Sequence, residues 1–118
     1  SLLSIYYEVK RKGVEPMKPH VQNLRIADVA KFSSDMVKNM FMYITDINTQ
    51  IQDKYAKSIL SSYGCEAAVV KRLNDNKYDW VGSIFCEFTR PIHVSEDEAR
   101  EIMHRCAMNI QYLLPEYK

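Results

Sequence analysis

The side chains of this protein that could act as nucleophiles or metal ligands include three cysteines and three histidines. Cysteine catalysis needs a thiolate held beside an imidazole, and Cys86 with His93 is the candidate pair. Alternation in the strand expected around Cys86 turns its thiol towards a core. His104 and Cys106 stand two residues apart in an expected helix and point in nearly opposite directions, so no spacing matches a metal site. We predict no catalytic residue, no metal and no cofactor.

Acidic and glycine motifs indicate no chemistry either. Paired carboxylates can catalyse hydrolysis, but the run Glu96, Asp97 and Glu98 is typical of a first helical turn, where negative charge suits the helix dipole. The three glycines lie far apart in the sequence, so no glycine-rich loop could hold a phosphate. We therefore expect neither an enzyme nor a protein that takes a small-molecule substrate.

Length and composition are those of one globular domain. The 118 residues are 47% hydrophobic and 26% charged with a net charge of +1, so neither disorder nor a strongly basic surface is indicated. No apolar run reaches the roughly 18 residues that a membrane span needs. The cysteines are odd in number and lack CxxC spacing, which predicts reduced thiols and an intracellular location, cytoplasmic or nuclear. Because the first residue is Ser1, the predicted single domain, residues 1–118, is expected to be excised or processed from a larger protein.

The C-terminal helix is the element that the sequence indicates most clearly. Ser95 followed by Glu98 forms a capping box, and Pro115 closes the helix. Between them, apolar residues recur at steps of three and four: Ala99, Ile102, Met103, Cys106, Ala107, Ile110, Leu113 and Leu114. This stripe predicts a helix that packs against a sheet.

Residues 26–63 also carry a helical pattern of apolar side chains. Gly64 would end this segment as a left-handed cap. Thr49 and Gln52 could form a second capping box inside it, so the segment is either one helix or two. An unbroken helix over residues 34–63 would be about 45 Å long. That exceeds the diameter of roughly 35 Å expected for the domain, so its apolar face would overhang.

Strands are expected on both sides of this segment. Residues 3–9 alternate between apolar and polar side chains, as a half-buried strand does. Residues 65–73 and 78–89 are rich in strand formers, and the turn formers of residues 74–77 join them into a hairpin. The order β-α(α)-β-β-α predicts an α+β fold. In it, a small antiparallel sheet of about three strands is covered on one face by a long or broken central helix and the C-terminal helix.

The predicted function is protein-protein interaction without catalysis, as a dimerising or adaptor module. The candidate surface is the apolar face of the central helix, rich in adaptable methionine side chains. Its residues are Met36, Met40, Ile44, Ile47, Ile51, Tyr55 and Ile59. A sheet edge is a second route to a partner. We expect a homodimer, because a second copy is the simplest cover for an overhanging face, and we expect no contact with a membrane.

A single-stranded nucleic-acid (RNA) interface is the alternative function. Aromatic side chains on a sheet can stack on bases while Lys and Arg side chains follow the phosphates. The candidate residues are Tyr6, Lys10, Arg11, Lys12, Lys71 and Arg72. No RNP-like string accompanies them, so this function is the second choice.

Overall fold

A three-stranded antiparallel sheet forms the centre of the molecule, in a computed structural model that describes residues 2–117. Its order is β3-β4-β5, with strands Phe41–Ile44, Ala67–Asn74 and Trp80–Phe88. The first four residues of β4 are buried without a break, so both faces of the central strand are apolar and both need a cover. The predicted α+β class with a small antiparallel sheet is confirmed.

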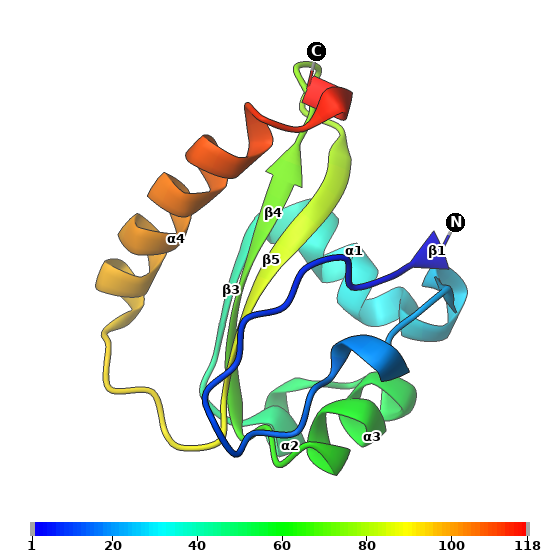
Figure 1. The fold of residues 1–118 in the computed structure, drawn as a ribbon, viewed down its shortest axis with the longest axis vertical. Helices are drawn as coiled ribbons and strands as arrows, with labels where there is room; N and C mark the ends of the chain where they lie inside the picture. The colour runs from blue at the N-terminus through cyan, green and yellow to red at the C-terminus, as the bar shows by residue number, and fades with distance from the viewer. Residues whose placement is uncertain (1, 118) are drawn as a thin grey trace.

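Helices supply that cover on both faces of the sheet (Figure 1). One face packs against α4, and the other faces the helical layer of α1, α2 and α3. The bounds are Ala30–Asn39 for α1, Ile47–Gln50 for α2, Lys54–Ser62 for α3 and Glu96–Gln111 for α4. The expectation that the central and C-terminal helices cover the same face of the sheet is wrong. Both faces of β4 are apolar, so exposing either face to water would be unfavourable.

The predicted central helix over residues 26–63 is wrong in its middle. Met40 has a left-handed backbone (φ 62°) and ends α1, with its N–H donating to the oxygen of Met36 at 3.1 Å. The following residues form β3, and Asp46 then caps α2 by accepting from the N–H of Asn48 at 3.0 Å. The apolar run of residues 40–44 suits a strand buried on both faces as well as a helix. No overhang results, since the molecule measures 37 × 31 × 28 Å.

The predicted strand over residues 3–9 is also wrong. A short strand, β1 (Leu2–Leu3), pairs with β2 (Leu24–Arg25) outside the main sheet, and residues 4–17 form neither helix nor strand. Tyr7 and Val9, two of the residues assigned to the inner side, are exposed. Alternation alone does not make a strand where no neighbour is available for pairing.

Three short 3₁₀ turns complete the secondary structure of residues 2–117. They are η1 (Lys18–His20), η2 (Ile26–Val29) and η3 (Pro115–Tyr117). The turn η2 leads directly into α1, and η3 follows α4 beside the tip of the β4–β5 hairpin (Figure 1).

The predicted hairpin and C-terminal helix are confirmed. The strands β4 and β5 pair antiparallel, and the N–H of Glu98 donates to the Ser95 hydroxyl at 3.2 Å at the start of α4. Gly64 follows α3 with φ 70°, as expected of a left-handed cap. Three of the eight residues of the predicted α4 stripe are buried, namely Ala99, Met103 and Ala107. Ile102, Cys106, Ile110 and Leu113 of the same stripe stay exposed.

Two apolar cores lie on opposite faces of the sheet. The core under α4 contains Phe41, Val69, Ala99 and Met103. The core under the other helices contains Met17, Ile44, Ile47, Ile51, Leu60, Cys65 and Ala68. Residues directly opposite one another on neighbouring strands share a face, so Ile44, Ala68 and Glu87 all face the second core.

Candidate ligand-binding cavity

A cavity of about 170 Å³ lies between the start of α1, the strand β3 and the connection from α2 to α3. We call it the α1–β3 cavity. Its apolar lining residues, which we call the floor, include Phe32, Met42, Ile44 and Ile51, and its polar lining residues include Lys31, Asp35 and Gln52. An apolar floor with a few polar groups around it is the usual composition of a small-molecule site.

Side-chain caps on backbone N–H groups fix the shape of this cavity. The carboxylate of Asp53, at the start of α3, accepts from the N–H groups of Lys31 and Phe32 at 3.1 and 2.6 Å. It therefore caps the first turn of α1 from a distant part of the chain. The Gln50 side-chain oxygen accepts from the N–H groups of Thr45 and Asp46 at 2.7 and 2.8 Å, which closes the turn after β3. The walls are thus tied to one another before any ligand arrives.

The rim of the cavity carries both signs of charge. Lys31 and Asp35, one turn apart on α1, form an ion pair of 3.2 Å. Both side chains keep solvent contact, so a polar ligand group can compete with this pair at low cost. Phe32 lies between them in the sequence, and its ring stacks on that of Phe85 of β5 with centroids 5.6 Å apart. The floor of the cavity is therefore in contact with the far strand of the sheet.

A second cavity, of about 120 Å³, lies between the sheet and α4. Its lining is apolar and includes Val69, Phe88, Ile92 and the two sulfur atoms of Cys86 and Met103, which are 3.6 Å apart. A cavity without polar groups can hold an apolar ligand, but it offers no hydrogen bond that would fix the orientation of the ligand. The α1–β3 cavity is the better candidate site.

The surface predicted for a protein partner is mostly interior. Met36, Ile44, Ile47 and Ile51 are buried within the same chain. Met40 and Ile59 are half-buried, and Tyr55 is exposed on α3. The seven residues belong to four separate elements and their connections rather than to one helix face, so the predicted interaction surface is wrong. The physical reason is that β3 interrupts the helical pattern and turns the surrounding side chains inward.

The residues predicted for nucleic acid do not form one patch. Tyr6, Lys10, Arg11 and Lys12 are exposed along the N-terminal segment. Lys71 is half-buried on the α4 face of β4, because it stands opposite Phe41. Arg72 is buried and points to the other face, so the predicted basic and aromatic face is not formed.

Arg72 instead connects three parts of the fold. Its guanidinium donates to the carbonyl oxygens of Val37 at 3.1 Å and Tyr78 at 2.6 Å, and to the side-chain oxygen of Asn74 at 2.5 Å. Val37 lies near the C-terminal end of α1, where the helix dipole is negative and favours a cation. Arg72 thus joins α1 to the tip of the hairpin, a role that its sequence context does not indicate.

The thiols and the possible metal ligands show no assembled centre in the described residues. Burial raises the pKa of Cys65 to about 11, so this thiol stays protonated at neutral pH. Among residues 2–117, no three His, Cys, Asp or Glu side chains converge as metal ligands would. Within the same range, none of the helices has the length and apolarity that a membrane crossing requires.

Glu87 is the acidic group with the most altered titration. Desolvation, and then the negative charge of Glu8, raises its pKa from 4.5 to about 7, although the side chain as a whole is exposed to solvent. Glu8 itself is held by the N–H groups of Met17 and Lys18, from which its carboxylate accepts at 2.8 and 3.2 Å. The N-terminal segment crosses in front of β5 in this region (Figure 1).

The raised pKa of Glu87 predicts a pH-dependent stability. The folded state binds the proton more tightly than the unfolded chain, so this stabilisation is present below about pH 4.5 and is lost as the pH rises through about 7. Between these values, the melting temperature of the unaltered chain should fall relative to that of Glu87→Gln. Glu101→Gln, which changes an exposed carboxylate on α4, should follow the unaltered chain. Parallel melting curves for all three proteins would contradict the assignment.

Comparison with known proteins supports a fold but no family. No protein-family model matches the chain, and no curated protein matches its sequence. The phycocyanobilin-bound GAF domain from a cyanobacterial phytochrome is similar over 89% of this chain, with a TM-score of 0.60 and 19% identity. The phycoerythrobilin-bound GAF domain from a cyanobacterial phytochrome is similar over 88%, with a TM-score of 0.60 and 17% identity. The chain spans 64% of the length of each of these two chains.

At this level of identity the likeness shows a shared fold. Both solved structures hold a bilin, which is a small molecule. The bilins bound by these similar structures contradict the prediction of a protein-interaction module with no small-molecule ligand. The sequence carries no phosphate loop or metal motif. The cavity was missed because its apolar floor and capped turns come from separate segments and have no sequence motif of their own.

Proposed function

We propose that this chain is a domain that binds a small organic molecule in the α1–β3 cavity and acts by binding rather than by catalysis. The observation that carries the proposal is the cavity itself, with its apolar floor under the charged pair of Lys31 and Asp35. The bilins held by the two solved structures of similar fold support the same class of function. An intracellular location is part of the proposal and is supported by the three free cysteines.

The size of the cavity supports a ligand smaller than a bilin. Pockets for drug-sized molecules measure roughly 300–1,000 Å³, and the α1–β3 cavity measures about 170 Å³. A compact metabolite with one apolar side and one polar or zwitterionic end suits this volume and rim. Its apolar part would lie on Met42 and Ile51, and its polar end would replace the contact between Lys31 and Asp35.

A ligand that contacts the floor can affect the packing of the rest of the sheet. A molecule that presses on Phe32 also acts on Phe85, because the two rings stack. Phe85 lies on β5, at the other edge of the sheet from β3. Such a contact suits a sensory role, in which occupancy shifts the packing between α1 and the sheet.

The proposal is tested by NMR titration of the labelled chain with amino acids, nucleosides and short-chain organic acids. At least one compound should shift the resonances of Phe32, Met42 and Ile51 together. Gln52→Trp places an indole at an exposed position of the rim and should weaken that binding about tenfold or more. Ser61→Trp, at an exposed position of α3 away from the cavity lining, is the control and should bind as the unaltered chain does. Binding that is equal in both variants, or no shift of these resonances by any compound, would refute the site.

A further inference from the structure

The lining of the α1–β3 cavity includes two side chains of opposite charge that contact each other. Lys31 Nζ lies 3.2 Å from Asp35 Oδ1, and the two residues are one turn apart on α1. The third charged residue of the lining, Asp53, uses both carboxylate oxygens to accept from N–H groups at the start of α1. The positive end of the helix dipole thus compensates the charge of Asp53. A ligand therefore meets one ammonium group and one carboxylate that can both change partner.

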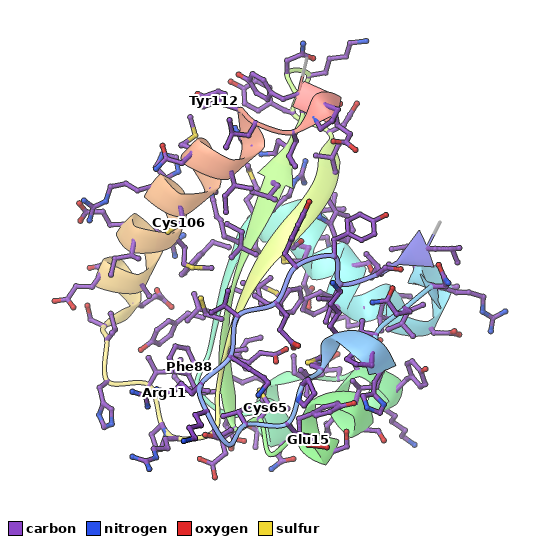
Figure 2. All side chains as sticks on the ribbon, in the orientation of Figure 1. Arg11, Glu15, Cys65, Phe88, Cys106 and Tyr112 are labelled. Carbon is purple, nitrogen blue, oxygen red and sulfur yellow. The ribbon has the colours of Figure 1, made fainter. Side chains whose placement is uncertain are left out.

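These two groups favour a ligand that carries both signs of charge. Within residues 2–117, the lining has no charged side chain besides Lys31, Asp35 and Asp53. Figure 2 shows Arg11 and Glu15, two charged residues of the N-terminal segment, and neither lines the cavity. A ligand with a single charge would separate the pair and leave one member without a partner. A zwitterion replaces one ion pair by two and leaves no charge unpaired.

The spacing of the two groups suits an α-amino acid. One carbon joins the ammonium nitrogen of an amino acid to its carboxyl carbon, which places the two atoms about 2.5 Å apart. The Lys31 and Asp35 groups are separated by a similar distance, 3.2 Å. Their side chains are 47% and 34% exposed, so both can adjust to a ligand. The carboxylate of an amino acid can therefore contact Lys31 while its ammonium group contacts Asp35.

The floor of the cavity suits an aliphatic side chain of moderate size. At the roughly 30 Å³ that a water molecule takes up in the liquid, a volume of about 170 Å³ holds about six non-hydrogen atoms. The floor cannot retreat to admit more, because Ile44 and Ile51 are each 5% exposed and belong to the core. Phe32 is held by its stacking on Phe85. The side chain of leucine fits this space, whereas a nucleoside is too large for it.

We propose that the α1–β3 cavity binds a free α-amino acid with an aliphatic side chain, such as leucine. This inference rests on the proposed function, because it names the ligand class of the same cavity. The ligand binds as the zwitterion that exists at neutral pH. Its carboxylate contacts Lys31, its ammonium group contacts Asp35, and its side chain lies on Met42 and Ile51.

Leucine and two analogues that each lack one of its charges test this proposal. Isocaproate lacks the ammonium group, and isoamylamine lacks the carboxylate. In an NMR titration, leucine should shift the resonances of Lys31, Asp35 and Met42 together, with a dissociation constant of about 1 mM. Each analogue should bind about fivefold more weakly or worse, because it leaves one charge of the pair without a partner. Alanine should bind about tenfold more weakly than leucine, because it barely reaches the floor.

Two variants assign the contacts of the zwitterion. Asp35→Asn should lower the affinity for leucine about fivefold and should not lower the affinity for isocaproate, which has no ammonium group. Lys31→Met should also lower the affinity for leucine about fivefold and should not lower that for isoamylamine, which has no carboxylate. Glu101→Gln is the matched control, because it breaks an ion pair of the same i,i+4 spacing on α4, away from the cavity lining. This variant should bind leucine as the unaltered chain does.

The outcomes separate this inference from the proposed function. If isocaproate or isoamylamine binds as tightly as leucine, the cavity is a ligand site but the zwitterion is not its ligand. Binding of a nucleoside, without binding of leucine, valine or methionine, leads to the same conclusion. Equal loss of leucine affinity in Asp35→Asn and Glu101→Gln would also overturn the amino-acid proposal. If no compound shifts the resonances of the lining at about 10 mM, both proposals are wrong.

Discussion

Ile47→Glu is expected to unfold this protein. Ile47 is 1% exposed and lies in the core between the sheet and the helices α2 and α3. The substitution removes about 2–5 kcal/mol of apolar packing. It also places a carboxyl group where no partner is available, which costs several kcal/mol more, whether the group is charged or becomes protonated. A domain of this size has a total stability of about 5–15 kcal/mol, so most of it would be lost.

Circular dichroism with urea titration measures this effect. The variant should show no cooperative transition, or one shifted to much lower urea concentration. Val37→Glu is the matched control, because Val37 belongs to the same apolar pattern in the sequence but is 56% exposed on α1. Its free energy of unfolding should change by no more than about 0.5 kcal/mol. A different result would contradict the structure: an unaltered chain that is a dimer and an Ile47→Glu variant that is a folded monomer. That result would support the predicted interaction surface on an exposed helix face.

Arg72→Met should lower the free energy of unfolding by about 3–5 kcal/mol. The substitution keeps most of the side-chain volume but removes every donor. The oxygens of Val37, Asn74 and Tyr78 would then lack the hydrogen bonds that the guanidinium supplies. For a chain of this length, the loss corresponds to a fall in melting temperature of about 12–20 °C. Arg72→Lys should recover part of it, because one ammonium cannot reach all three acceptors.

Lys71→Met is the control for this prediction. Lys71 neighbours Arg72 on β4 but points to the opposite face, and its pKa is lowered by desolvation, then by the charges of Arg100 and Arg72. Loss of an ammonium that sits in an unfavourable environment should leave the stability unchanged or slightly higher. Equal destabilisation by Arg72→Met and Lys71→Met would show that the three hydrogen bonds of Arg72 do not stabilise the fold.

Local signals in the sequence are confirmed where neighbours in the chain complete them. The cap of α4 needs Ser95 and Glu98, which are three residues apart, and the turn of the hairpin needs residues 74–77. A few adjacent residues supply both the hydrogen bonds and the backbone geometry of such features. The α+β class followed from these elements.

The central segment shows where local reasoning fails. Residues 40–44 fit a helix by their spacing and a strand by their continuous apolar character. The choice depends on hydrogen bonds to β4, more than twenty residues further along the chain, as in the pairing of Ile44 with Ala68. Propensity is a weak guide when a partner strand is available, and tertiary pairing then decides.

The hairpin, the C-terminal helix and the α+β class could be predicted from the sequence, because each rests on contacts within a short stretch of chain. Which apolar residues are interior, and where a ligand could bind, depends on how distant segments pack. The α1–β3 cavity brings together Phe32, Met42 and Ile51, which come from three separate parts of the chain. Such sites depend on the packing of elements that are far apart in the chain, and no spacing of residues encodes that packing directly.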